Sequence, residues 1–406
     1  MSRKAFFVIL LVAFVDSMGV GLVYPLFSTM LFSPAWHVVP PDASAGVRGF
    51  WLGILISLTP LIQTMLSPFV GALSDRIGRR PLILGTLLFG VVSYLVAMLG
   101  VRLQSLALLL VGRAILGVAA SNYAAANACI ADLSSPEEKA GRFAKASMAF
   151  GAGFAVGPIL GGFLVGDGVI LAQSFLRPFF FSGCLSLLNA TAIYLWLPET
   201  RIGSTNVETT HPWRSLIRDI VDISVPARYL LLAIFLFCFG WGFYGELIPV
   251  WWVTQFHMSP AQVGTFFTYG ACWYVTMCWL VVPPVMAWVP HVRMFEIATF
   301  LLAFAIWTLF VTPSETAFWW LIPFQNIALA FFFPVSATVL SEQVSSDHQG
   351  KIMGLHAAAE CFGVGIGPAI SGAFLGLHLL MPIAIGGVSA FVAGMLIGRA
   401  RKLAAA

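Results

Sequence analysis

The sequence predicts an all-α membrane protein that crosses the bilayer twelve times. Composition is the first observation behind this prediction: of 406 residues, 59% are hydrophobic and only 9% are charged, whereas a soluble domain carries about 25% charged residues. The second is that apolar runs of about 20 residues, the length a helix needs to cross a bilayer, recur along the chain. Lipid offers the backbone no hydrogen-bond partners, so these runs must be helical.

The apolar runs set the order of the elements. We expect membrane spans at residues 5–28, 50–70, 82–101, 105–128, 146–166, 177–197, 228–250, 262–286, 293–313, 317–338, 352–376 and 380–398. The largest break in hydrophobicity, residues 198–227, is polar and charged and reads as a cytoplasmic linker. It separates an N-terminal half of six helices, residues 1–197, from a C-terminal half of six, residues 228–406.

The positive charges predict the orientation. With these spans, Arg48, Arg102 and Arg177 fall on one side of the membrane, and Arg113 falls within it. All the other lysines and arginines fall on the opposite side: Arg3, Lys4, Arg76, Arg79, Arg80, Lys139, Arg142, Lys145, Arg201, Arg214, Arg218, Arg228, Arg293, Lys351, Arg399, Arg401 and Lys402. Positive charge marks the cytoplasmic side, so both termini are expected there.

An internal repeat supports two halves of similar construction. The span 146–166 carries Gly153, Gly157, Pro158, Gly161 and Gly162, and four of these positions recur 210 residues later as Gly363, Gly367, Pro368 and Gly372. Glycines four residues apart allow close helix contact, and proline permits a bend. Either a surface that moves between two states or ordinary tight packing explains these residues.

Four charged residues fall deep within predicted spans: Asp16, Arg113, Glu246 and Glu360. A charge in the bilayer costs at least about 2.5 kcal/mol, so each is a functional candidate. A carboxyl group at Asp16 would be neutral when desolvated and ionised when wetted or paired, which suits a proton carrier. A static pair with Arg113 explains it too. Arginine keeps its proton, so Arg113 would tune Asp16, bind an anionic substrate group or hold helices together.

The second half offers further polar candidates. His356 and Glu360 are four residues apart and share a helix face, so we expect them to bind a proton or contact a substrate. Unsatisfied polar groups are costly in lipid, so some of the polar residues within the spans should line a cavity. The candidates for substrate contact are Glu246, Tyr244, Asn122, Gln325, Asn326 and His356.

The short hydrophilic stretch Gly71–Pro81, which reads GALSDRIGRRP, joins two predicted spans as a tight hairpin. Its notable residues are Gly71, Asp75, Arg76, Gly78, Arg79 and Arg80. Three arginines beside a span mark its cytoplasmic end. We expect Asp75 to pair with one of these arginines or with a helix N-terminus. A loop that only fixes the topology is the simpler interpretation.

Several kinds of site are not expected. The six cysteines fall in or beside apolar runs without metal-site spacing, and we predict no metal, no cofactor and no disulfide. No nucleophile or phosphate-binding motif indicates an enzyme, and the net charge of +4 is too small to indicate nucleic-acid binding. Met1–Lys4 runs straight into the first span, with no evident cleavable signal peptide. We expect a monomer whose partners are lipid, protons and a small molecule.

These motifs together resemble the major facilitator superfamily. The stretch Gly71–Arg80 resembles the signature between its helices 2 and 3, Arg113 with Gly117 resembles the helix 4 signature, and Gly153–Gly162 resembles the helix 5 signature of antiporters. Residues 16–26, 197–200 and 347–354 look like segments of twelve-helix drug/proton antiporters, including the tetracycline group.

The resemblance implies a secondary transporter in a bacterial inner membrane that exports a small organic molecule in exchange for protons. Within such a transporter we expect Asp16 and Glu360 to take part in proton coupling, Arg113 to tune Asp16, and the Gly71–Arg80 loop to act as a conformational latch. Glu246 and Glu360 look like additions to the family pattern. The span 82–101 lacks the acidic residue expected in tetracycline antiporters, which argues against tetracycline itself.

Two other functions stay open at the level of sequence. Proton-coupled uptake of a polar metabolite or a siderophore-like anion fits the arginines outside and within the membrane. A non-transporting receptor or scaffold would use the same fold, although the intact loop motif and the costly buried carboxylates argue against it.

Overall fold

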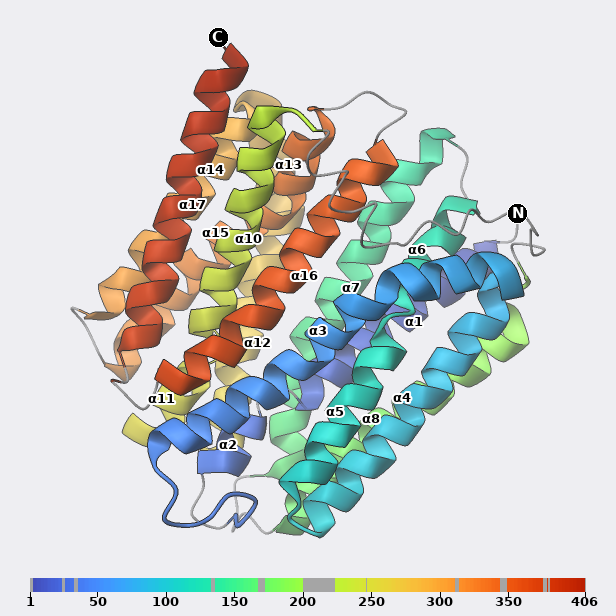
Figure 1. Cartoon of the computed structure of the whole chain (residues 1–406), viewed down its shortest axis with the longest axis vertical. Coiled ribbons are helices and arrows are strands. Elements are labelled where there is room, and N and C mark those ends of the chain that lie inside the picture. Colours follow the sequence, from blue (N-terminus) through green and yellow to red (C-terminus); the bar gives the residue numbers. More distant parts are fainter. Residues whose placement is uncertain are drawn as a thin grey trace. The chain divides into compact units, whose positions relative to one another are not determined.

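The computed structural model describes residues 3–23, 26–32, 36–132, 136–166, 172–199, 223–245, 247–310, 314–343, 349–374, 378 and 380–405. Within these residues the chain forms helices and no strands (Figure 1). Eleven helical segments are long and apolar enough to cross a membrane. The all-α polytopic fold predicted from the sequence is therefore confirmed, with one span fewer than the twelve expected.

The span not counted among these eleven is the one predicted at residues 293–313. There the structure has α14 (His291–Trp307), a helix of 17 residues, followed by the 3-10 turn η3 (Thr308–Phe310). At about 1.5 Å per α-helical residue and about 2 Å per 3-10 residue, the two together cover about 30 Å, the thickness of the bilayer core. Residues 311–313, the end of the predicted span, lie outside the described part of the chain.

The first half of the sequence forms helices whose boundaries depart from the hydropathy runs. They are α1 (Arg3–Val23), α2 (Leu26–Phe32), α3 (Ala45–Ile77), α4 (Arg79–Arg102), α5 (Leu106–Ala120), α6 (Tyr123–Asp132), α7 (Pro136–Val165), the 3-10 turn η1 (Ala172–Phe175) and α8 (Leu176–Trp196). The predicted span 105–128 is broken: a turn at Ser121 and Asn122 separates α5 from α6.

The rest of the chain contains α10 (Val225–Gly245), α11 (Ile248–Gln255), α12 (Pro260–Thr276), the π-helical segment η2 (Met277–Val281), α13 (Val282–Trp288), α14, α15 (Glu315–Ser341), α16 (Gln349–Phe374) and α17 (Met381–Ala405). Residues 200–222, most of the predicted linker, lie outside the described residues. The proposed division into two halves joined by this linker therefore stays a prediction.

The chain forms two compact units. The first comprises residues 1–43, 58–209 and 252–268, and the second comprises residues 44–57, 210–251 and 269–406. Two helices, α3 and α12, each contribute residues to both units.

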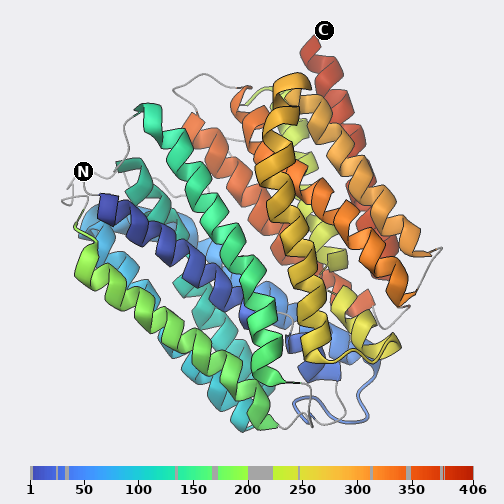
Figure 2. The ribbon, with the colours of Figure 1, turned by 180° about the vertical axis from the view of Figure 1, so that it is seen from behind.

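In the first unit, α1 packs against α7 and α8, and α4 packs between α5 and α8 (Figure 1). Figure 2 shows the long contact of α1 with α7 and α8 from behind. An apolar core that includes Ile9, Val12, Ile83 and Ile193 fills the space where α1, α4 and α8 meet. These contacts hold the middle of α1, where Asp16 lies, against α8.

In the second unit, α10 packs against α16 and α17, and α14 packs against α15 and α17. The core here is aromatic: Phe237 stacks on Phe332, and the ring centroid of Phe295 lies 5.0 Å from that of Phe332. All three rings are buried. This packing joins α10, α14 and α15.

The internal repeat is visible in how the glycines pack. Gly157 of α7 lies against α1, where an added Cβ would be 2.6 Å from the backbone oxygen of Met18. Gly367 of α16, 210 residues later, lies against α10, where an added Cβ would be 2.7 Å from the backbone oxygen of Phe239. The helix pair α1–α7 thus has a counterpart in α10–α16, built from equivalent glycines.

A second pair of contacts repeats at an offset of 211 residues. Gly264 of α12 packs against Pro158 of α7 in the first unit, and an added Cβ would be 2.5 Å from the Pro158 oxygen. Gly53 of α3 makes the same kind of contact with Pro368 of α16 in the second unit. Each glycine–proline motif therefore receives a glycine from a helix that is shared by the two units.

Candidate functional site

Asp16 lies in the middle of α1 and is held by two amide side chains. Asn189 of α8 donates hydrogen bonds from Nδ2 to Asp16 Oδ1 at 2.7 Å and to the backbone oxygen of Val12 at 3.3 Å. Asn122, in the turn between α5 and α6, makes a second side-chain hydrogen bond with the Asp16 carboxyl group. Amide nitrogens donate and a carboxylate accepts, so these partners suit the ionised form of Asp16.

Tyr94 of α4 is the neighbour that Asp16 and Arg113 share. Its buried ring is close enough to interact electrostatically with both side chains. Its hydroxyl group forms a hydrogen bond with Ser182 of α8. Tyr94 thus interacts with both Asp16 and Arg113, and the direct pairing of the two charged residues stays a prediction.

Arg113 of α5 is a buried cation, with only 4% of its surface exposed. Its guanidinium carbon lies 5.3 Å from the centroid of the Phe27 ring, which is a cation–π contact. The backbone at Arg113 accepts a hydrogen bond of 2.9 Å from the Thr59 hydroxyl of α3. A cation–π contact is strongest where water is excluded, as here, and a guanidinium keeps its charge in such a place.

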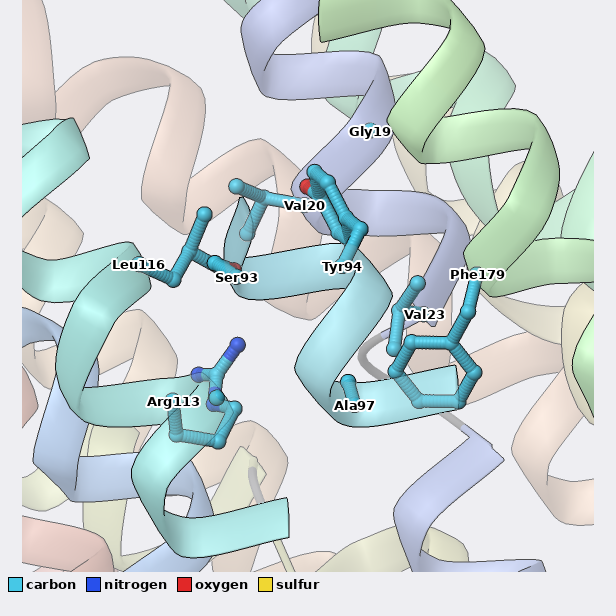
Figure 3. Close-up of a pocket in the computed structure, with 10 residues that line it drawn as sticks. Gly19, Val20, Val23, Ser93, Tyr94, Ala97, Arg113, Leu116 and Phe179 are labelled. Atoms are coloured by element: carbon cyan, nitrogen blue, oxygen red, sulfur yellow. The ribbon is translucent and has the colours of Figure 1, made fainter. Parts of the chain in front are cut away.

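A small pocket opens beside these residues (Figure 3). Gly19 and Val20 of α1, Tyr94 of α4 and Arg113 of α5 line it. Its free space matches about one water molecule. In this conformation the pocket has room for a water beside the tyrosine and the guanidinium, but it is too small for a drug-sized molecule, which needs about 300 Å³ or more.

The second unit contains a chain of polar groups on α15 and α16. The Ser336 hydroxyl lies 3.0 Å from the backbone oxygen of Phe333 and 2.9 Å from His356 Nε2. A hydroxyl has one proton, so it donates either to Phe333 or to the ring. If it donates to Phe333, His356 donates from Nε2; if it donates to the ring, Nε2 is the acceptor.

Glu360 extends this chain by one helical turn. Its Oε1 lies 3.6 Å from His356 Nε2, beyond an ordinary hydrogen bond, and 25% of its side-chain surface is accessible. Tyr274 and Cys238 are close enough to interact with it electrostatically. The expected juxtaposition of His356 and Glu360 on one helix face is confirmed.

The remaining candidates of the second unit divide into a pair and two separate residues. Gln325 of α15 donates from Nε2 to the hydroxyl oxygen of Tyr244 on α10 at 2.9 Å, and both side chains are buried. Asn326 uses its amide nitrogen on the backbone oxygen of Ile322, within its own helix. Glu246 lies outside the described residues, so its expected contact with a substrate stays a prediction.

The hairpin at Gly71–Pro81 turns at a single residue. Helix α3 continues through Gly71 and Arg76 to Ile77, and α4 begins at Arg79. Gly78, between them, has a φ of +100°, a conformation that favours glycine. The tight hairpin expected for this stretch is therefore confirmed: the turn itself is Gly78, and the residues on either side of it are helical.

Glu199, just after α8, is the anion at the N-terminus of α4. Its carboxylate accepts hydrogen bonds from the backbone N–H of Arg79 at 2.8 Å and of Arg80 at 3.1 Å. A carboxylate at a helix N-terminus is favoured by the free N–H groups and by the helix dipole. We expected Asp75 as a partner for such a terminus; its side chain lies outside the part of the chain that the structure describes.

Arg79 and Arg80, two of the three arginines of the hairpin, bind different neighbours. The Arg79 guanidinium donates a hydrogen bond to the hydroxyl of Ser74 at the end of α3. Arg80 donates to the backbone oxygen of Tyr194 on α8, and its guanidinium lies 5.5 Å from the centroid of that ring. Together with Glu199, these contacts join the ends of α3, α4 and α8.

The glycines of α7 serve close packing on two sides. Gly153, Gly157 and Gly161 lie against the backbone of α1, and Gly162 lies against Pro260 of α12. This contact holds α1, and with it Asp16, directly on α7. Whether the same surface also moves during function is not decided by packing alone, and the conformational role of the motif stays a prediction.

Three residues of the site were not singled out from the sequence: Tyr94, Ser182 and Glu199. The sequence does indicate a polar face on α8, because Ser182, Ser186 and Asn189 are spaced by four and three residues and fall on one side of a helix. Tyr94 carried no comparable signal in its apolar run.

Comparison with protein families identifies the architecture. The model described as Major Facilitator Superfamily matches residues 9–324 and 230–404. The chain is 27% identical over 379 residues to the class C tetracycline resistance protein of Escherichia coli, which covers 91% of this chain and 89% of that protein. It is 25% identical over 391 residues to multidrug resistance protein 2 of Bacillus subtilis, with 95% and 92% coverage.

Solved structures agree on the fold. The human organic anion transporter MFSD10 (TETRAN) superposes with a TM-score of 0.73 at 21% identity, over 97% of this chain and 99% of that chain. The inward-open xylose transporter XylE of E. coli superposes with a TM-score of 0.74 at 16% identity, over 97% and 96%. The family match over most of the sequence, the membrane helices and these folds agree: this chain belongs to the Major Facilitator Superfamily.

Proposed function

We propose that this transporter exports a small organic molecule from the cell in exchange for protons. The observation that carries the proposal is Asp16: an acidic residue in a membrane helix that is hydrogen-bonded to amides and lies close to Tyr94, next to a buried arginine. The drug-resistance names of the bacterial relatives support export of such a molecule. We place the protein in the inner membrane of a bacterium.

In this mechanism, Asp16 binds and releases the transported proton. The amides of Asn189 and Asn122 stabilise its ionised form, whereas the low dielectric of the membrane interior favours its neutral form. These opposing effects leave Asp16 responsive to small changes in its access to water. A proton carrier must respond in this way if access alternates between the two sides of the membrane.

Arg113 acts on Asp16 without carrying the proton. Its charge is permanent, and Tyr94 is close to both residues. Protonation of Asp16 removes one negative charge from the neighbourhood that it shares with Tyr94 and Arg113. Protonation therefore changes the electrostatic balance of α1, α4 and α5 together, which gives the proton a way to act on the conformation.

In the second unit, Glu360 and His356 provide a second proton site or a contact for the substrate. Glu360 Oε1 lies 3.6 Å from His356 Nε2, and that ring nitrogen lies 2.9 Å from the Ser336 oxygen. We assign substrate contacts to Glu246, to the Tyr244–Gln325 pair and to Asn326 in the second half of the sequence, and to Asn122 in the first. The Gly71–Arg80 hairpin and the Gly153–Gly162 surface act as conformational elements.

The experiment that tests this proposal is proton movement in vesicles that contain the purified protein and a pH-sensitive dye. A library of drugs, peptides, sugars and organic acids is added, and substrate-triggered proton movement identifies a ligand. We expect Asp16→Asn to abolish that movement while the protein stays folded. Asp42→Asn, which removes an exposed carboxyl group outside the spans, is the matched control and should leave it unchanged.

Two outcomes would count against the proposal. Wild-type proton movement in Asp16→Asn would remove Asp16 from the coupling mechanism. No proton movement with any compound, from protein shown to be folded, would favour uncoupled transport or a non-transporting role.

A further inference from the structure

We propose that Asn189 is a positioning residue that reads the protonation state of Asp16, and that its side-chain amide turns over when Asp16 takes up a proton. This inference rests on the proposed function, in which Asp16 is the proton site. It assigns to α8 a part in coupling that neither the family motifs nor the charged residues indicate.

The first step is a count of hydrogen-bond groups. Asn189 is fully buried, and its amide has two N–H donors and one acceptor oxygen. Both donors are used, one on Asp16 Oδ1 at 2.7 Å and one on the Val12 backbone oxygen at 3.3 Å. Its Oδ1 is buried and has no hydrogen-bond partner among the described residues. A buried amide oxygen without a partner costs free energy, so this arrangement must be compensated elsewhere.

The compensation is the charge on Asp16. A hydrogen bond to an ionised group is stronger than one between neutral groups. With Asp16 ionised, the short bond from Asn189 offsets the unsatisfied oxygen on the other side of the same amide. The orientation of Asn189 is therefore the one expected beside a carboxylate.

Protonation reverses this preference. A neutral Asp16 carries an O–H that donates and needs an acceptor. A half-turn of the Asn189 amide supplies its Oδ1 as that acceptor, so this oxygen is no longer unsatisfied. Nδ2 moves into the former place of Oδ1 and gives up its bonds to Asp16 and Val12, so the new bond from the Asp16 O–H must offset their loss. The Val12 oxygen still has its hydrogen bond within α1. The proton comes from water and stays on Asp16, while Asn189 only rotates.

The other charged and titratable groups near Asp16 do not affect the comparison between the wild type and an Asn189 variant. Tyr94 from α4 interacts with Asp16 and also with Arg113 from α5. Both are the same in the wild type and in an Asn189 variant. A difference in the proton affinity of Asp16 between the two proteins therefore comes from the Asn189 amide.

The chain supplies a matched control on the same helix face. Ser186, one turn before Asn189 on α8, donates to the backbone oxygen of Leu87 on α4 at 3.0 Å. It is also buried, and it also joins α8 to a neighbouring helix, but its bond runs to the backbone rather than to a carboxyl group. Loss of a simple structural bond between α8 and a neighbouring helix is thus reproduced by Ser186→Ala.

The test is infrared difference spectroscopy of the full chain in lipid, with pH as the variable. The carbonyl band of a protonated carboxylic acid that disappears in Asp16→Asn reports Asp16 directly, without any transport substrate. Asn189→Leu keeps the approximate shape and removes the donor. We expect the pH midpoint of the band to rise by about one unit in this variant, a tenfold higher proton affinity, and to stay unchanged in Ser186→Ala.

A second variant guards against misfolding. Asn122→Leu removes the other amide next to Asp16 and should raise the midpoint in the same direction if Asn189→Leu does not fold. An unchanged midpoint in folded Asn189→Leu, with the Asp16 band present, would overturn the role of Asn189 and leave the proton site standing. Absence of any band that depends on Asp16 in the wild type would overturn the proton site itself, and this inference with it.

Discussion

Asp16 and Glu360, two carboxyl groups deep within membrane spans, have different neighbours. Asp16 receives amide donors from Asn189 and Asn122, whereas Glu360 has His356 at 3.6 Å and accessible space around it. A carboxylate bound by donors is ready to release a proton, and one without them is ready to bind a proton or a cation. This difference supports distinct roles for the two residues.

Sequence alone indicated several of these residues but not their partners. Asp16, Arg113 and Glu360 stood out because a charge is rare and costly in an apolar run. Their partners depend on the rotation of each helix about its axis, which hydropathy does not determine. Asn189 was visible only as one of several polar residues, and the placement of Tyr94 near both charges had no sequence signal.

Gly78 provides a prediction for the hairpin. Its φ is +100°, and an added Cβ would lie 2.5 Å from Glu199 Oε2, so Gly78→Ala should strain the turn and displace the carboxylate from α4. We expect a loss of about 1–3 kcal/mol of unfolding free energy, measured by thermal unfolding in detergent.

Gly85→Ala is the control for this prediction, because an added Cβ in that part of α4 meets nothing within 4 Å. Alanine is favoured over glycine in a helix by up to about 1 kcal/mol, so this variant should be as stable as the wild type or slightly more stable. Equal stability of the two variants would contradict the described turn.

The Tyr244–Gln325 hydrogen bond gives a second prediction at this scale. Both groups are buried, so Tyr244→Phe should leave the amide nitrogen without its acceptor and cost about 1–3 kcal/mol. Gln325→Leu should remove the need for that acceptor. In a double-mutant cycle of unfolding free energies we expect a coupling of about 1 kcal/mol; additive effects would show that the bond does not contribute.

At the scale of elements, apolar length located the helices, and it failed where helices break. The run 105–128 is continuous in hydropathy, yet a turn at Ser121 and Asn122 divides it. The run 262–286 is continuous as well, yet Met277–Val281 is π-helical, and the Val282 N–H bonds to Met277 five residues back. Pro283 and Pro284 follow directly and lack the N–H groups that regular helix bonds require.

The glycine contacts of α7 and α16 predict equal sensitivity in the two halves. Gly157→Ala and Gly367→Ala would each place a Cβ 2.6–2.7 Å from a backbone atom of the neighbouring helix. A backbone cannot move aside easily, so each should cost about 1–3 kcal/mol. Gly354→Ala in α16, where nothing lies within 4 Å, is the control. The measurement is thermal unfolding of the three variants. Destabilisation of only one of Gly157→Ala and Gly367→Ala would show that the two glycine contacts are not equivalent.

At the scale of the whole molecule, the sequence repeat predicted two similar halves, and the contacts repeat with it. The glycine–proline motifs are 210 residues apart, the glycines that meet them are 211 apart, and the α1 and α10 contacts are 221 apart. The differing offsets show why a simple sequence comparison finds only part of the repeat. The chemistry is not repeated: the position equivalent to Asp16 in α10 is Phe237, a core aromatic residue.

This asymmetry places the proposed proton chemistry in different helices of each half. Asp16 is on α1 in the first unit, and Glu360 is on α16 in the second. Two dissimilar sites in a repeated scaffold suit a protein that must couple two different ligands, a proton and a substrate.

The measurement that tests proton-coupled export most directly is accumulation of the identified ligand in vesicles under an imposed pH gradient. With the interior more acidic, an antiporter releases protons outward and concentrates the ligand inside. We expect this accumulation in the wild type and in Asp42→Asn, and its loss in Asp16→Asn. Accumulation only with the exterior more acidic would show symport, and accumulation that ignores the gradient would show that protons are not coupled at all.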